Sequence, residues 1–452
     1  MREAMFRKTL CLSLILFNPW AHPCWSEPLV ISLALKNETQ ALKTASADYQ
    51  TGRRGRPLWP GARYTEVDRA RALHRGMRFI YRTALNKRNF DEYGHDYLWC
   101  FYTIGRSTQD AALRRMAQRM GVERARRWRR DHPVLPENAD AGTISNYAFG
   151  CDAADSLGVR DDAMKEQMRR AAPRFTARDY LRFDPVNEPP PVDVPDECEY
   201  CGAGNTRGSK TCHVCKRPLK MRNRYDVWYD ALITAYVGER YGVMLGARYA
   251  DVLKWLPTMR PFRGSEKGAN PEFYDEVYAV THIVYTLNNY SMYRLSPRWL
   301  PQEFEFLKAN LKEAIAQRDS DMLGEFMDSL KAFGLTTDDP QIRAGMDYLL
   351  SHQNADGSWG YMKEKDIYNR YHPTWNGVAG LSDYAWQGER LSFPEVKPLL
   401  EQWSGKARRK DRSHISYLRS EILNLSSPIP PPSSLLFQPV AGHVAPEGEA
   451  AP

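Results

Sequence analysis

The chain of 452 residues contains no apolar run that approaches the roughly 18–20 residues needed to cross a bilayer. Cysteine is scarce, and eight cysteines in a chain of this length exclude a disulfide scaffold. The formal charge of +8 arises locally, because the first 188 residues hold 32 Lys and Arg against 22 Asp and Glu. We therefore expect no nucleic-acid partner and no transmembrane segment in the mature protein. Alternation of apolar and polar residues is also scarce, which argues against a β-rich fold.

Several common catalytic motifs are missing. The sequence has no glycine-rich phosphate loop, no G-x-S-x-G nucleophile elbow and no H-E-x-x-H metal motif. What it has in quantity is aromatic residues, at 12% of the chain, together with helical apolar patterns. Such a chain can bury a large core and line a cavity with rings.

The two ends differ in composition from the middle. Residues 1–26 combine a basic start with a short apolar run, Leu10 to Phe17, and predict a signal peptide. The protein is therefore expected to be secreted or periplasmic. Residues 27–64 are read as an N-terminal segment and linker, and residues 426–452 as a disordered Pro-rich tail.

An element with an aromatic anchor recurs about every fifty residues. The anchors are Tyr97, Tyr147, Trp228, Tyr278, Phe326 and Trp375, at intervals of 50, 81, 50, 48 and 49 residues. Amphipathic helices are expected between them, at 67–85, 111–127, 246–256, 301–316 and 339–351. Six pairs of one buried and one half-exposed helix predict an all-α fold, a six-repeat α/α toroid of about twelve helices. An open helical solenoid would use the same pairs. Repeats 1–2 would occupy residues 65–184, and repeats 3–6 residues 221–425.

The one long interval contains an insert, residues 185–220, with a Pro-rich linker and four cysteines. Cys198, Cys201, Cys212 and Cys215 form C-x2-C-x10-C-x2-C, a spacing that places four thiolates around one zinc ion. A four-cysteine site is closed, so a structural zinc ribbon is expected. The alternative is two disulfides, which export would favour.

Residues 343–360 read RAGMDYLLSHQNADGSWG. This segment resembles the QW motif of squalene-hopene cyclases and related terpene cyclases. The matching residues are Arg343, Ala344, Tyr348, Leu349, Gln353, Gly357 and Trp359. The following YHPTWNGVAGL resembles an inner helix of those cyclases and of protein prenyltransferase β subunits. The resemblance implies an α/α toroid in which Gln353 caps a helix end and Trp359 stacks on the neighbouring repeat.

The sequence lacks the catalytic motifs of those families, so the resemblance does not imply their reactions. The acidic DxDD motif of the cyclases is missing, and the nearest runs, Asp319 to Met322 and Thr337 to Pro340, depart from it. The zinc ligands of the prenyltransferases have no evident counterparts. Acid–base groups are instead expected near the starts of the inner helices, where they would face a shared lumen. The catalytic candidates are His282, Asp230, Asp328 and His372. The substrate-binding candidates are Trp228, Tyr229, Tyr278, Trp375 and Asp96. The structural alternatives are helix capping for Asp96, a hydrogen bond to a backbone group for His372, and core packing for the rings and for His282.

Three functions remain open. The first is an exported enzyme whose lumen takes an apolar or cyclic small molecule. The second is a polysaccharide lyase or another carbohydrate-active toroid enzyme. The third is a binding protein without catalysis, in which the lumen would be filled by side chains.

Overall fold

The computed structural model describes residues 55–404, and most of this part of the chain is helical, in helices α2 to α15. Within these residues, strand is limited to a short antiparallel pair, β1 (Val194–Pro195) with β2 (Met221–Arg222). The expectation of an all-α chain is thus confirmed. The expected signal peptide, most of residues 27–64, residues 405–425 and the expected tail at 426–452 lie outside the described residues. No described helix combines the length and the apolar character needed to span a membrane.

The six aromatic anchors lie in six different helices. These are α3 (Lys87–Ser107), α5 (Ala141–Ser156), α8 (Arg224–Tyr241), α11 (Phe273–Leu287), α13 (Ser320–Ala332) and α15 (Tyr368–Leu381). All of these except α3 contain no exposed residue, so neighbours cover them on every side. Small and uncharged residues suit that position, because they allow helices to approach closely.

The remaining helices lie before or between these six along the chain, and all of them except α14 and the short α9 and α10 expose charged residues. They are α2 (Glu66–Leu85), α4 (Ala111–Asp131), α6 (Asp162–Ala171), α7 (Ala177–Leu181), α9 (Tyr249–Leu253), α10 (Leu256–Met259), α12 (Pro301–Ala316) and α14 (Pro340–Ser351). Short 3₁₀ turns at Ala172–Arg174, Glu266–Gly268 and Pro394–Val396 complete the helical structure of this region.

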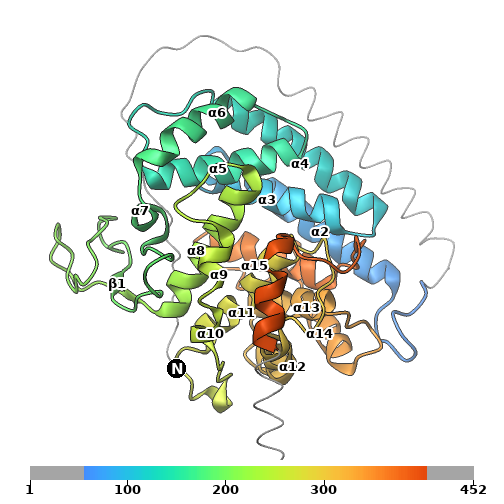
Figure 1. Cartoon of the computed structure of the whole chain (residues 1–452). Coiled ribbons are helices and arrows are strands. Elements are labelled where there is room, and N and C mark those ends of the chain that lie inside the picture. Colours follow the sequence, from blue (N-terminus) through green and yellow to red (C-terminus); the bar gives the residue numbers. More distant parts are fainter. Residues whose placement is uncertain (1–54, 405–452) are drawn as a thin grey trace, which may run out of the picture. The chain divides into compact units, whose positions relative to one another are not determined.

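The contacts among the six anchor-bearing helices run in a cycle. Helix α3 contacts α5, α5 contacts α8, α8 contacts α11, α11 contacts α13, α13 contacts α15, and α15 contacts α3 again. Outside this cycle, α4 packs on α3 and α5, α6 on α5, and both α12 and α14 on α13 (Figure 1). The last helix of the cycle therefore meets the first, as well as α2.

One predicted helix is wrong. The sequence predicted a continuous helix over 246–256, but the structure has two short helices, α9 and α10. Gly246 has a φ of +87°, and a Cβ there would lie 2.9 Å from the Cα of Ala177. This glycine thus serves a close approach to α7 and cannot begin a helix. Pro257 then starts a separate helical turn, because it offers no backbone N–H to continue the first.

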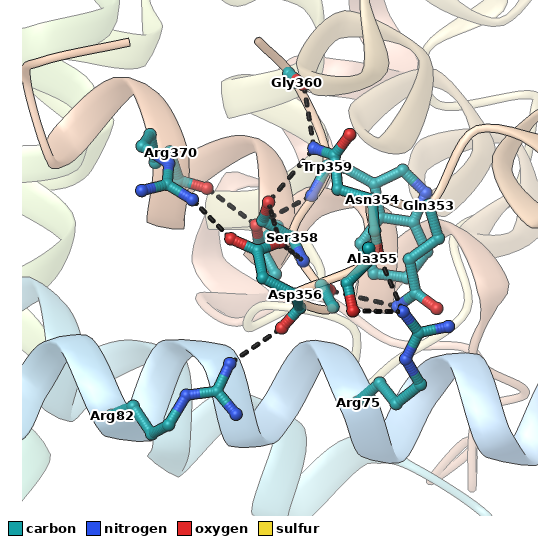
Figure 2. A network of polar contacts seen from close by, with 12 residues as sticks. Arg75, Arg82, Gln353, Asn354, Ala355, Asp356, Ser358, Trp359, Gly360 and Arg370 are labelled. Atoms are coloured by element: carbon teal, nitrogen blue, oxygen red, sulfur yellow. Dashed lines mark hydrogen bonds and ion pairs between the residues drawn. The ribbon is translucent and has the colours of Figure 1, made fainter. Parts of the chain in front are cut away.

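The QW-like segment ties α14 and α15 to α2 through polar contacts, which Figure 2 shows from close by. Arg75 of α2 donates to the carbonyls of Asn354 and Ala355 at 2.7 and 2.9 Å. Gln353 donates to the carbonyl of Ala72 at 2.8 Å, so its amide serves a backbone group of α2. Asp356 joins both ends of this network, because Arg82 donates to its carbonyl and Arg370 of α15 pairs with its carboxylate.

Trp359 fills the space between α2 and α15. Its ring is 1% exposed, and its Nε1 donates to the carbonyl of Leu349 at 2.8 Å. A Cβ at Gly76 of α2 or at Gly377 of α15 would come within 2.8 and 2.7 Å of the indole. Both glycines therefore leave room for this one side chain, which packs the end of the described chain against its beginning.

Candidate active site

A cavity of about 500 Å³ lies among the six anchor-bearing helices, and each of them contributes to its wall. Aromatic side chains in the wall include Tyr93, Trp99, Phe149, Tyr285, Tyr290, Tyr368, Trp375 and Tyr384. Ionisable side chains in the wall include Asp96, Asp230, His282, Glu325, Asp328 and His372. The wall thus combines ring surfaces with acid–base groups, which is the usual composition of a small-molecule site.

The structure brings together most of the residues that the sequence singled out. All four catalytic candidates, His282, Asp230, Asp328 and His372, line the cavity. Trp375 lines it as well.

Asp96 also lines the cavity and does not cap a helix. The cap of α3 is Asn86, and the Asp96 carboxylate accepts a hydrogen bond from the Tyr371 hydroxyl at 2.7 Å.

The other three aromatic candidates lie behind the wall. The ring of Tyr229 stacks on His282 at 5.1 Å between centroids, and the ring of Tyr278 lies 5.8 Å from the same imidazole. Trp228 is fully buried, and its Nε1 donates to the carbonyl of Val252 at 2.9 Å. Tyr229 and Tyr278 thus orient a cavity histidine, whereas Trp228 belongs to the packing between α8 and α9.

His282 is held in one orientation by its own helix. Its Nδ1 lies 2.8 Å from the carbonyl of Tyr278, so this nitrogen carries the proton. The stacking on Tyr229 fixes the plane of the ring. Nε2 is then the basic nitrogen of the neutral ring.

Asp328 is a buried carboxyl group with hydroxyl neighbours. The Ser291 hydroxyl lies 2.7 and 2.8 Å from its two oxygens. Burial raises the pKa of Asp328 to about 6, which exceeds the lowering by the Ser291 and Tyr384 hydroxyls and by Lys331. Asp328 can therefore hold a proton at mildly acidic pH.

The backbone that presents Ser291 is strained. Asn289, Tyr290 and Ser291 have φ values of +55°, +51° and +63°, all in the left-handed region and none of them glycine. Tyr290 and Ser291 both line the cavity. Strain of this kind is retained where the surrounding structure enforces it, and it concentrates at functional sites.

A second cluster joins α13 to α15, and sequence reasoning missed its central residue, Asp321. Asp319 caps α13 through the N–H groups of Asp321 and Met322, and this places Asp321 in the first turn. Its carboxylate lies 2.8 Å from His372 Nδ1, and Asn376 donates to it at 2.6 Å. A signal was present in the sequence, because Asp321 with Glu325 and His372 with Asn376 each show the four-residue spacing of one helix face.

The cluster carries two carboxylates and one imidazole. Burial lowers the pKa of His372, but the Asp321 carboxylate outweighs it and raises the pKa to about 9. His372 is therefore an imidazolium at neutral pH. The ligand atoms of Asp321, Glu325 and His372 lie within 4.8 Å of one another, so these residues could also hold a metal ion. Within residues 55–404, the four cysteines form the other such group.

The four cysteines of the insert lie close together, as their spacing predicted. Sγ of Cys198 lies 3.4 Å from that of Cys215, and Sγ of Cys201 lies 3.6 Å from that of Cys212. These separations are far from the roughly 2.05 Å of a disulfide bond. They are near the approximately 3.8 Å expected between sulfurs that share one tetrahedral zinc at about 2.3 Å. The four thiols are a possible metal site and are not paired as disulfides.

The fold and the site define an all-α protein with a ring-lined cavity that carries acid–base groups, inside a cycle of helices. A scan against protein-family models finds no match, and searches of the curated proteins and of the solved structures find none either.

Proposed function

We propose that the chain is an exported enzyme of the α/α-toroid kind, whose lumen binds an apolar or cyclic small molecule and supplies acid–base catalysis. The closed cycle of contacts among the six anchor-bearing helices supports the toroid. The QW-like contacts between α2 and α15 support its closure. The observation on which the proposed function depends is the cavity itself. A lumen filled by side chains would instead have favoured a binding protein without catalysis.

The size and lining of the cavity fit a small substrate. Its volume of about 500 Å³ falls in the range of roughly 300–1,000 Å³ typical of small-molecule sites. Trp99, Trp375 and Tyr290 offer ring faces to an apolar skeleton. Ring faces also stabilise positive charge, which develops when an alkene is protonated.

Asp328 is the proposed proton donor and His282 the proposed base. The protonated Asp328 carboxyl would transfer its proton to a carbon–carbon double bond, which leaves a carbocation on the substrate. Attack by a second double bond would form a ring. His282 Nε2 would then remove a proton from the carbon next to the new cation. The proton gained by His282 balances the one lost by Asp328, so the product is an isomer of the substrate.

The test is product analysis with a panel of acyclic isoprenoid alkenes, read by gas chromatography and mass spectrometry. We expect cyclic isomers with the natural chain and none with Asp328→Asn. The matched control is Asp131→Asn, which changes a carboxylate at the end of α4 that pairs with Arg127. Absence of any isomer, with the protein folded, would refute the cyclase proposal.

One observation favours a second candidate, a lyase that acts on acidic polysaccharides. Arg182 lines the cavity and is solvent-accessible, and within residues 55–404 its guanidinium has no hydrogen bond or ion pair. Its backbone is left-handed, with φ of +67°. The carboxylates of Asp230, Asp196 and Glu197 interact with the guanidinium through charge, and its unused N–H groups suit a uronate carboxylate. Release of unsaturated uronate from acidic polysaccharides, absent with Arg182→Met, would favour this candidate, and absence of release would exclude it.

We further propose that the four cysteines bind zinc. Their separations support a tetrahedral site, and the insert is too small to build a core of its own. Cys198, Cys212 and Leu219 form only a small separate cluster of buried residues, with Ala203 and Cys215 packed against it.

A further inference from the structure

The cysteine insert, residues 185–220, forms part of the cavity wall. Glu197, which directly precedes the first cysteine, lines the cavity, and so does Arg222, just beyond the end of the insert. Figure 1 shows β1 and the loops around it next to α7 and α8. The sequence had suggested a module separate from the repeats, but its base faces the same space as the helices.

Backbone pairing closes the insert at that base. Val194 pairs with Arg222, and Pro195 with Met221, in the antiparallel β1–β2 ladder. The Asp196 N–H then donates to the carbonyl of Lys220 at 2.8 Å. The first cysteine follows two residues later, so a metal bound to the thiols would fix this short stretch of backbone at both ends.

Arg222 connects the insert to a cavity carboxylate. Its Nε lies 2.6 Å from Asp196 Oδ1, and its Nη1 pairs with Asp230 of α8. The Arg222 side chain is 12% exposed, whereas that of Asp230 is 41% exposed. One largely buried guanidinium thus joins a carboxylate of the cysteine insert to a carboxylate that faces the cavity.

We propose that metal binding by the four cysteines positions Arg222 against Asp230, so that the insert acts as a metal-dependent wall of the cavity. Arg222 is a positioning residue in this arrangement, and Asp230 is the group that it holds. When the metal leaves, the Asp196 anchor loosens, Arg222 withdraws, and Asp230 loses this ion pair and becomes more exposed than its present 41%. The inference rests on the proposed function in taking the cavity as the working site and the four cysteines as the metal site.

Carboxyl footprinting of the full chain tests this without any substrate. A carbodiimide and glycine ethyl ester label accessible carboxylates, and mass spectrometry reads each site. We expect labelling of Asp230 to rise at least twofold when the metal is removed with a chelator. Asp328, which is 5% exposed and lies on α13, should stay at its low level.

Variants distinguish a local loss of the Arg222–Asp230 contact from general unfolding of the protein. Arg222→Met should raise Asp230 labelling as much as the chelator does while the metal stays bound, as a zinc-sensitive dye would report. Arg222→Lys should give a smaller rise, because an ammonium keeps the charge but loses the two-sided geometry. The matched control is Arg207→Met, since Arg207 pairs with Glu188 and Asp193 within the insert and not with Asp230.

Two results would overturn the proposal. Chelation could leave Asp230 labelling unchanged, which would make the insert independent of the cavity. Chelation could also raise the labelling of Asp230 and Asp328 equally, which would mean that the metal holds the whole fold. Neither result bears on whether the cavity turns over an alkene.

Discussion

Buried carboxyl groups in the cavity wall are the residues on which the proposed chemistry depends. Asp328 holds a proton up to about pH 6 because burial disfavours its charged form. Behind the wall, the Asp321 carboxylate lies 2.8 Å from Nδ1 of His372. One helix, α13, thus carries a carboxyl group that can donate a proton and, about two turns earlier, a carboxylate paired with an imidazole.

Asp328→Asn should abolish turnover and stabilise the protein at neutral pH. The pKa of Asp328 is raised from 3.8 to about 6 on folding, so its contribution to stability is lost as the pH rises from about 4 through 6. Asparagine does not ionise, so the variant does not lose this stability, and its side-chain oxygen can still accept a hydrogen bond from Ser291. We expect a gain of about 1–3 kcal/mol in the free energy of unfolding at pH 7.5 and little change at pH 4. Urea unfolding at both pH values measures it, and equal effects at both would contradict the assignment.

The natural chain should lose stability as the pH becomes alkaline, and His372→Gln should lose less. The raised pKa of His372, about 9, means that its stabilising charge is fully present below pH 6.5 and disappears as the pH rises through 9. The natural chain should therefore lose up to a few kcal/mol between pH 7 and 9.5, and the variant should lose less. Urea unfolding across this range measures the difference. Parallel curves for the two proteins would show that the pair with Asp321 contributes nothing.

At the scale of single residues, the sequence located the acid–base groups but not their partners. Asp328 and His372 could be named because each lies within three residues of an aromatic anchor, Phe326 or Trp375. Asp321 was passed over because its run does not match a known acidic motif. The Arg222–Asp230 pair could not be foreseen, because it depends on how the insert returns to α8.

The QW-like segment is the element that joins the last repeat to the first helix. Trp359→Ala should cost about 3–5 kcal/mol, because it empties a tightly packed site between Gly76 and Gly377. Thermal unfolding should then begin roughly 5–10 °C lower. Tyr361→Ala is the control, since that neighbouring side chain is 69% exposed and should change little. A stable variant that has lost activity would place Trp359 in the site instead.

The cysteine insert should bind about one zinc per chain, measured by elemental analysis. Cys198→Ser should release the metal, because the remaining three thiolates no longer close the site. Zinc affinity should also fall as the pH decreases, since the thiols must lose protons to bind. No metal in protein purified from its native compartment, with all four thiols oxidised, would replace this site by two disulfides.

At the scale of elements, helix positions could be predicted well where apolar periodicity was uninterrupted. The expected 301–316 agrees with α12, and 339–351 differs from α14 by one residue at its start. The failure at 246–256 has a local cause, because Gly246 is required for contact with Ala177. The periodicity of apolar residues does not show where a tertiary contact requires a particular backbone conformation.

For the whole molecule, the regular spacing of six aromatic anchors was the informative signal. Each anchor lies in its own helix, and those six helices contact one another in a cycle. The spacing could not reveal the size of the cavity, because that depends on how far each side chain reaches inward. It also could not show that the insert contributes Glu197 to the cavity wall.

Turnover of isoprenoid alkenes in heavy water tests the central claim most directly. If a protonated carboxyl of the cavity starts the reaction, each cyclic product should carry one deuterium from the solvent, seen as a mass increase of about one unit. Asp328→Asn should give no product, and Asp131→Asn should match the natural chain. Product without deuterium, or equal product from Asp328→Asn, would contradict the account.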